Sequence, residues 1–301
     1  MKGGLKNLHM VVLMGGPGSE REVSLRSGAA VANALRQGGY RVSELEIAGP
    51  DFALPPDAGL CVNMIHGTFG EDGALQEILE ARGVAYTGEG VAGSRLAFDK
   101  KESKRRFERA GVPTARWEMI SVGQRPNLPL PLVVKAPREG SSVGVHIVRA
   151  AGELDAALAE CASHDREILV EEFVAGRELT VGVVGDRALA VVEIRPREGF
   201  YDYAHKYTKG ASDYFCPAPL DAETTARVRA AALEAHRSLG LEVYSRVDIL
   251  LRDDGSLCVL ETNTIPGMTE TSLLPKAAAA AGMTFLGLCE EIAGLSLQRF
   301  L

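Results

Sequence analysis

Short apolar runs alternate with amphipathic stretches through the first third of the chain. The pattern predicts strands at 10–14, 41–47, 60–65 and 84–86, and helices at 20–37 and 72–82. Such alternation is typical of a parallel sheet covered by helices. Ser19 and Glu22 have the spacing of a capping box for the first helix, and the Gly38-Gly39 pair is expected to end it.

The pattern changes near Asp99, where a second unit is expected to begin. A basic helix at 100–109 precedes predicted strands at 132–135, 144–148 and 167–172 and a helix near 153–162. From about Glu178 we expect antiparallel β structure with two long helices, 221–239 and 272–294. The fold class is therefore α/β followed by α+β, with three domains at 1–97, 98–177 and 178–301.

Composition narrows the class of protein. The 301 residues are 46% hydrophobic and 24% charged, as in ordinary globular proteins. The net charge of −7, with no basic block, argues against a nucleic-acid partner. Five widely spaced cysteines fit reduced thiols in a cytoplasmic protein better than disulfides or a zinc site. No apolar run has the length of a signal peptide or a membrane span, so we expect no membrane insertion.

The strongest chemical signal is a predicted hairpin near the C-terminus. Two apolar runs are separated by Asp-Asp-Gly-Ser at 253–256, and Asp-Gly between such runs favours a tight turn. If the Asp-Gly pair forms the turn, Asp248 faces Glu261 and Arg246 faces Asn263. Opposed carboxylates repel each other, and a divalent cation removes that cost. Mg²⁺ takes such oxygens together with phosphate. A surface hairpin with scattered acids is the alternative.

Three further segments combine glycine or an aromatic residue with polar side chains. His66 opens the run HGTFGEDG directly after a strand, where open α/β sheets bind ligands; the alternative is a structural histidine. Lys135 precedes a Gly-Ser-Ser loop that is able to wrap a polyphosphate, although a solvated hairpin has the same composition. The strand end at 171–174 offers backbone groups and an apolar wall to a flat base.

Two segments later in the chain suggest a lid and an anion receptor. Residues 197–210 mix lysines and tyrosines without a period, which is consistent with a lid that closes over substrate or with a disordered surface loop. Gly267 frees a backbone N–H, and Ser272 begins the last predicted helix, a favourable place for a carboxylate. Near the N-terminus, Glu20 either complements a helix dipole or points toward an ammonium group.

In their order and spacing, these motifs resemble the D-alanine–D-alanine ligase family of the ATP-grasp superfamily. The matching segments are 19–24, 66–73, 99–100, 139–144, 201–207, 246–248 and 261–268. The resemblance implies an ATP-grasp fold behind an N-terminal parallel-sheet (pre-ATP-grasp) domain. It also implies a cytoplasmic enzyme, commonly a homodimer, that joins two D-alanine molecules for peptidoglycan synthesis with ATP and two Mg²⁺ (or Mn²⁺) ions.

The resemblance implies a nucleotide and metal site. The phosphate ligands would be Lys100 and Lys135 at the α- and β-phosphates and Lys206 at the γ-phosphate. Adenine would lie against Glu171, Phe173 and Val174, and the ribose against Glu178. The metal ligands would be Asp248, Glu261 and Asn263, with Glu261 bridging the two ions.

Substrate and catalytic residues also follow from the resemblance. Glu20 would pair with the first D-alanine ammonium beside His66, and Ser272 with the Leu273 amide would receive the second carboxylate. Arg246 and the Gly267 N–H would stabilise an oxyanion. Ser141 and Tyr207 would latch the lid to the Glu20 region.

The implied reaction begins when the first D-alanine carboxylate attacks the γ-phosphate and forms an acyl phosphate. The amine of the second D-alanine then attacks that carbonyl and expels phosphate. Two alternatives stay open: an ATP-grasp ligase for another amine or hydroxyl, and a nucleotide-binding regulatory protein without chemistry. The Lys206-Tyr207 pair favours peptide over ester formation. Thr262 and Ile265 depart from the commonest family residues, and neither carries a proposed ligand.

Overall fold

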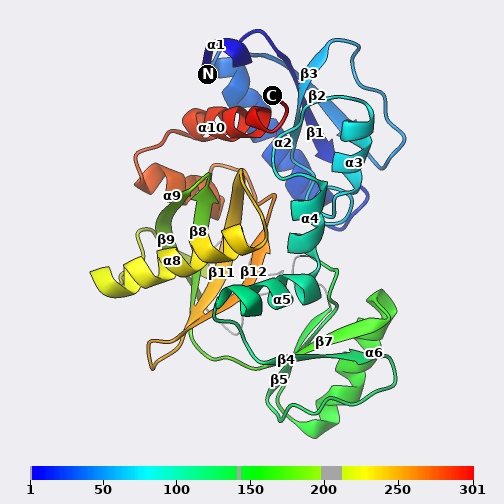
Figure 1. The fold of residues 1–301 in the computed structure, drawn as a ribbon, viewed down its shortest axis with the longest axis vertical. Helices are drawn as coiled ribbons and strands as arrows, with labels where there is room; N and C mark the ends of the chain where they lie inside the picture. Colours follow the sequence, from blue (N-terminus) through cyan, green and yellow to red (C-terminus); the bar gives the residue numbers. More distant parts are fainter. Residues whose placement is uncertain (1, 141–143, 198–211) are drawn as a thin grey trace.

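The described residues form three β-sheets that follow one another along the molecule (Figure 1). The computed structural model describes residues 2–140, 144–197 and 212–301. Figure 1 places the N-terminal sheet at one end, the four-stranded sheet of the central segment at the other, and the five-stranded sheet between them.

The N-terminal sheet is parallel, as the alternation predicts. Its central strand β1 (His9–Gly15) lies between β2 (Arg41–Ile47) and β3 (Ala58–Asn63). Helix α2 (Arg21–Gln37) covers one face and α3 (Ala74–Ala81) the other. β1 is therefore buried on both sides and reads as an uninterrupted apolar run. A short helix, α1 (Lys2–Leu5), precedes the sheet.

Two local predictions for this unit are wrong. The segment 84–86 makes only an isolated bridge, between Cys61 and Tyr86, rather than a strand. The capping box does not form, because α2 begins one residue later than the box requires. Glu20 occupies the N-cap position, and its side chain makes no capping hydrogen bond.

Helix α4 (Val91–Phe98), which the pattern did not predict, leads into the central unit, whose first helix is α5 (Lys100–Ala110). Its antiparallel sheet has the order β4-β7-β5-β6, and β4 (Trp117–Ser121) was also missed. The other strands and the covering helices lie near their predicted positions: β5 (Leu132–Lys135), β6 (Val145–Val148), η1 (Ala151–Glu153), α6 (Leu154–His164) and β7 (Glu167–Glu172). Leu132 and Val134 pack with α6, so Val133 and Lys135 face the opposite side of the sheet.

The third sheet is antiparallel in the order β10-β9-β8-β11-β12. Its strands are β8 (Arg177–Val184), β9 (Arg187–Pro196), β10 (Ser212–Phe215), β11 (Tyr244–Leu251) and β12 (Leu257–Asn263). Helix α8 (Ala222–Ser238) covers one face, where Val247 and Ile249 lie in the core. Alternation along β11 then directs Arg246 and Asp248 to the other face.

The β11–β12 hairpin has the predicted pairing but not the predicted turn. Asp248 pairs with Glu261, and Arg246 pairs with Asn263. Leu251 pairs with Leu257, however, and the Arg252 N–H donates to the Ser256 carbonyl oxygen at 2.9 Å, so Asp253, Asp254 and Gly255 form a three-residue loop in which Gly255 has φ +79°. A bulge between Asp248 and Ile249 reverses the resulting shift in register. The two irregularities cancel, which brings the acids into opposition.

The C-terminal helical region is two helices, not the single helix expected at 272–294. α9 (Leu273–Ala280) ends before Gly282, whose φ is +81°, and α10 (Phe285–Gln298) begins after a Thr284 N-cap. α10 lies beside α2, and both contribute to one hydrophobic cluster (Figure 1). Among the described helices none alone is long and apolar enough to span a membrane. α9 and α10 meet that test only as a pair bent by 103°.

Candidate active site

Two cavities meet in the cleft between the three units. The larger, about 360 Å³, lies among α2, α4, the loop after β3 and the segment 261–273. The smaller, about 110 Å³, lies between the uncovered faces of the two antiparallel sheets. Four residues line both cavities: Lys100, Arg246, Glu261 and Leu273. This shared junction therefore carries two cations and a carboxylate.

Every predicted site residue in the described ranges lines one of these cavities. The larger cavity contains Glu20, His66, Asn263, Gly267 and Ser272. The smaller contains Lys135, Glu171, Phe173, Val174, Glu178 and Asp248. Ser141, Lys206 and Tyr207 lie outside the described residues.

The smaller cavity is an apolar slot with a charged end. Its walls include Val133 and Ile147 from the central sheet and Leu250 and Leu260 from the hairpin. These residues occupy the alternate positions of their strands that the covering helices leave open. A slot of this kind suits a flat base with a charged tail, because the base removes apolar surface from water while the tail reaches the charged end.

Lys135 and Glu171 form an ion pair at the charged end. Glu171 is 2% exposed and is also paired with Lys104 of α5, which sequence reasoning missed. Burial raises the pKa of the Glu171 carboxyl, but Lys104 and Lys135 outweigh burial and hold that pKa at about 2. The pKa of Lys135, which burial lowers, is raised overall by Glu171. Both charges are therefore retained inside the protein.

The opposed acids of the hairpin already have partners within the chain. Arg246 donates two hydrogen bonds to Asp248, Nε to Oδ1 at 2.9 Å and a terminal nitrogen to Oδ2 at 2.7 Å. Asn263 Nδ2 donates to Asp248 Oδ2 at 3.2 Å, and Lys100 Nζ lies 3.8 Å from Glu261 Oε2. Their repulsion is thus offset without a metal, which revises the sequence argument that a cation is needed to stabilise the pair.

The donor set nevertheless fits Mg²⁺. Asp248, Glu261 and Asn263 offer hard carboxylate and amide oxygens along one face of the hairpin. Within the described ranges no group of three or more His, Cys, Asp or Glu side chains is arranged to hold a metal alone. Mg²⁺ usually binds through one or two carboxylates together with substrate phosphates, and Asp248 and Glu261 supply two carboxylates.

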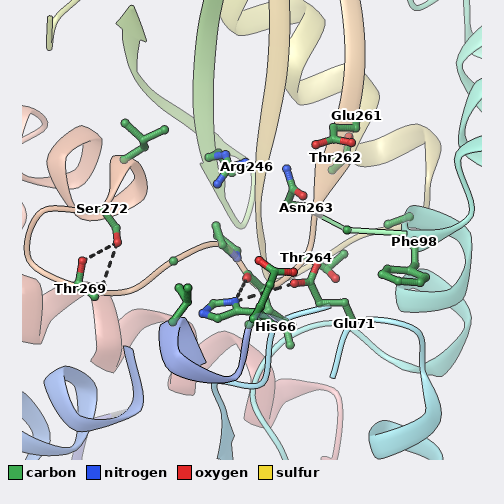
Figure 2. Close-up of a pocket in the computed structure, with 18 of the residues that line it drawn as sticks. His66, Glu71, Phe98, Arg246, Glu261, Thr262, Asn263, Thr264, Thr269 and Ser272 are labelled. Carbon is green, nitrogen blue, oxygen red and sulfur yellow. Dashed lines mark hydrogen bonds and ion pairs between the residues drawn. The ribbon is translucent and has the colours of Figure 1, made fainter. Parts of the chain in front are cut away.

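Figure 2 shows the larger cavity. Arg246, Glu261 and Asn263 extend into it from the hairpin, while His66 and Glu71 lie on the opposite side. Glu20 is 9% exposed. A Cβ at Gly67 would lie 2.9 Å from Glu20 Oε2, and one at Gly140 would lie 3.0 Å from it. These glycines leave room for the carboxylate, which lines the cavity and provides a negative charge for an ammonium group.

His66 is held by the protein at both ring nitrogens. Its Nδ1 lies 2.7 Å from the carbonyl oxygen of Ile265. Because a carbonyl only accepts, Nδ1 carries the proton, and Nε2 accepts from Ser27 Oγ at 3.2 Å. Ser27 Oγ accepts in turn from the Met268 N–H at 3.2 Å. The histidine thus connects α2 to the loop that carries Gly267.

Glu71, in the run that His66 opens, is a buried acid on the wall of the larger cavity. Burial raises the pKa of its carboxyl to about 8, and the nearby Glu20 charge adds to that shift. Oε1 accepts a hydrogen bond from the Gly67 N–H at 2.9 Å. Its neighbour Asp72 accepts from Phe69 and Ala74 backbone N–H groups and has a structural role at the start of α3.

Gly267 and Ser272 lie together at the third side of the cavity. A Cβ at Gly267 would lie 2.9 Å from Ser272 Oγ, so a larger residue there would displace the Ser272 hydroxyl. Ser272 is the N-cap residue of α9, but its hydroxyl contacts Thr269 rather than the first turn of that helix (Figure 2). The Leu273 N–H at the helix start is therefore not capped by Ser272.

The apolar slot between two antiparallel sheets, with lysines and an acidic hairpin at its charged end, is typical of a nucleotide-binding protein of the ATP-grasp type. The family described as "D-ala D-ala ligase C-terminus" matches residues 106–293. The D-alanine–D-alanine ligase of Methylacidiphilum infernorum is 49% identical over 97% of this chain and 96% of its own length. The chain belongs to the D-alanine–D-alanine ligase family.

Solved structures of similar proteins have the same fold. The D-alanine–D-alanine ligase of Bacillus anthracis, solved in complex with ATP, has a TM-score of 0.86 at 30% identity and covers 97% of this chain and 98% of its own. The VanG D-Ala:D-Ser ligase of Enterococcus faecalis has a TM-score of 0.85 at 28% identity, covering 95% and 98%. The chain is an ATP-dependent ligase that forms a carbon–nitrogen bond between two D-alanines, with ATP and Mg²⁺, in peptidoglycan synthesis.

Proposed function

We propose that the smaller cavity holds ATP, that the larger cavity holds both D-alanine molecules, and that the γ-phosphate is transferred at their shared junction. The observation that carries this proposal is the set of residues that line both cavities. Lys100 and Arg246 bring positive charge to that point, where the phosphate and the attacking carboxylate are both negative. Phosphoryl transfer depends on such positioning and charge neutralisation.

The nucleotide roles follow from the lining of the smaller cavity. Phe173, Val174 and the strand that carries Glu171 enclose adenine, and Glu178 binds the ribose. Lys135 and Lys100 contact the α- and β-phosphates, while Lys206, outside the described residues, is assigned to the γ-phosphate. Asp248, Glu261 and Asn263 hold Mg²⁺, which neutralises phosphate charge when bound.

The substrate roles follow from the larger cavity. Glu20 pairs with the ammonium of the first D-alanine, whose carboxylate then points toward the junction. His66 fixes the loop above it through Ile265. Ser272 and the Leu273 N–H receive the carboxylate of the second D-alanine. Arg246 and the Gly267 N–H stabilise the oxyanion that forms when the second amine attacks the acyl phosphate. Ser141 and Tyr207 are assigned to the latch of a lid.

Phosphate release in the presence of ATP, Mg²⁺ and D-alanine alone tests this proposal. D-alanyl-D-alanine and one phosphate per dipeptide are the expected products. D-serine and D-lactate offered with D-alanine test the acceptor, since a protein of this fold is a D-Ala:D-Ser ligase. Absence of ATP-dependent phosphate release with D-alanine alone would exclude the proposed reaction.

We also propose the division into domains at 1–97, 98–177 and 178–301, a cytoplasmic location and a homodimer. The central segment has its own hydrophobic core under α6, which supports a separate domain there. A cytoplasmic location is supported by the need for ATP as substrate and by the five cysteines, none of which forms a disulfide. Light scattering during size-exclusion chromatography would test the dimer, since a monomer mass at micromolar concentration contradicts it.

A further inference from the structure

Lys104 is a buried lysine that the proposed reaction does not use. It is 1% exposed, although lysine is almost never fully buried unless it is paired. Its ammonium group is ion-paired with Glu171 and donates a hydrogen bond to Thr114 Oγ1 at 2.8 Å. Lys104 lines neither cavity. Any effect on the reaction must therefore pass through its partners.

The Glu171 carboxylate is shared between Lys104 and Lys135. Lys135 lines the smaller cavity, which is proposed to hold ATP. If Lys135 were the only partner of Glu171, the pair would have no net charge. A neutral pair attracts a polyphosphate only weakly. The second ammonium, from Lys104, leaves the buried cluster with one net positive charge beside the cavity.

The contacts of Lys104 also link α5 to two neighbouring strands. Lys100 and Lys104 are four residues apart, so they lie on the same face of the helix. Lys100 lies at the junction of the cavities, 3.8 Å from Glu261. Thr114, the second partner of Lys104, donates from Oγ1 to the Val259 carbonyl oxygen at 2.8 Å. The contacts of Lys104 thus connect α5 with β7 and with the strand that carries Glu261.

We propose that Lys104 is a positioning residue for ATP: acting through Glu171, it presents Lys135 to the phosphates with a net positive charge. This inference rests on the proposed function in one respect, the assignment of Lys135 to the phosphates. It adds a residue that does not touch the nucleotide and assigns Glu171 an electrostatic role.

Substitution of Lys104 by methionine tests the inference. Lys104→Met is expected to raise the Kd of a non-hydrolysable ATP analogue with Mg²⁺, measured calorimetrically without D-alanine, about tenfold or more. KM for D-alanine is expected to stay within about twofold, because neither substrate carboxylate site contacts this cluster. Lys104→Arg keeps the charge and is expected to retain most of the affinity.

Lys101→Met is the matched control. Lys101 lies on the same helix and is ion-paired with Glu167 of the same strand at 2.7 Å, but it lines neither cavity. Its replacement is expected to leave the Kd for nucleotide unchanged. Equal losses in Lys101→Met and Lys104→Met would show a general effect of α5 and overturn the inference.

A double variant separates the charge mechanism from simple packing. In Lys104→Met/Glu171→Gln, Lys135 again has one unneutralised positive charge, so most of the affinity lost in Lys104→Met is expected to return. A double variant that binds the nucleotide no more tightly than Lys104→Met overturns the inference. If Lys104→Met fails to fold, the affinity of the double variant is compared with that of Lys104→Arg, and a much weaker double variant overturns the inference.

Different outcomes would contradict the proposed function and the role of Lys104. Wild-type protein that binds no ATP, or Lys135→Met that binds ATP normally, contradicts the assignment of Lys135. Wild-type affinity in Lys104→Met, together with impaired Lys135→Met, overturns only the role of Lys104.

Discussion

Asp248 of β11 lies directly opposite Glu261 of β12, and a bulge beside Asp248 compensates for a three-residue turn to keep them there. Asp248 lines the smaller cavity, whereas Glu261 lines both. Of the two carboxylates, Glu261 is therefore the one that is able to contact ligands in both cavities. This difference leads to the first prediction.

Glu261→Gln is expected to reduce kcat about 10²–10³-fold, because an amide cannot supply the negative charge that the proposed Mg²⁺ site requires of this residue. The free energy of unfolding without nucleotide should change by less than about 1 kcal/mol, since the Glu261 side chain is 28% exposed and its contact with Lys100 is long. Steady-state phosphate release and urea unfolding measure the two effects. Asp253→Asn, an exposed acid in the same hairpin, is the control. A large loss of metal-free stability would mark Glu261 as structural instead.

Mg²⁺ is expected to stabilise the protein only together with ATP. The three proposed ligands are too few to bind the ion tightly without phosphate oxygens. Mg²⁺ alone should leave Tm unchanged, while saturating ATP with Mg²⁺ should raise it by about 5 °C. Thermal unfolding with and without a chelator measures this. A comparable rise with Mg²⁺ alone would point to a preformed metal site elsewhere.

Ser27→Ala is expected to raise KM for D-alanine more than KM for ATP. The substitution leaves His66 Nε2 and the Met268 N–H without their present partner, which should cost about 1–3 kcal/mol of stability and loosen the loop that carries Gly267. Ser24→Ala is the control, because Ser24 is equally buried on α2 but its hydroxyl bonds to Gly15 and Met64 instead. Parallel changes in both KM values, or the same change in Ser24→Ala, would argue against a specific role for the His66 connection.

Glu71 is expected to make stability depend on pH in the neutral range. Its folded-state pKa is raised from 4.5 to about 8, so the folded protein keeps a proton that the unfolded chain has lost. Stability should be intact below pH 4.5 and fall as the pH rises toward 8, by up to about 1.4 kcal/mol per pH unit. The advantage of Glu71→Gln over wild type in urea unfolding should therefore grow between pH 5 and 8. Glu77→Gln, an exposed acid of α3, should show no such trend, and parallel curves for wild type and Glu71→Gln would refute the shift.

The Asp248–Glu261 pairing holds because a bulge compensates for a loop one residue longer than expected, and only the hairpin itself, from the apolar runs on either side of the turn, was predictable. The compensating bulge was not, since one extra residue in a strand leaves almost no mark on a short pattern. The break after α9 did leave a signal: Gly282 follows the alanine run, and Thr284 follows as an N-cap. The strong helix propensity of alanine concealed it.

Burial was the harder part of the site to predict. Lys104 stands in a helix rich in charged residues, and a charged stretch of this kind predicts side chains exposed to solvent. Only its contacts in the folded protein, with Glu171 of β7 and with Thr114, reveal that it is buried. His66 was correctly located at the end of β3, but its two hydrogen bonds depend on α2 and on the loop at 264–268, which are distant in sequence.

The most direct test of the account is a crystal structure with ATP, Mg²⁺ and D-alanine. We expect the nucleotide between the two antiparallel sheets and Mg²⁺ about 2.0–2.1 Å from oxygens of Asp248, Glu261 and Asn263, with phosphate oxygens completing the shell. Metal ions held by other residues, or a nucleotide bound outside that cavity, would contradict it.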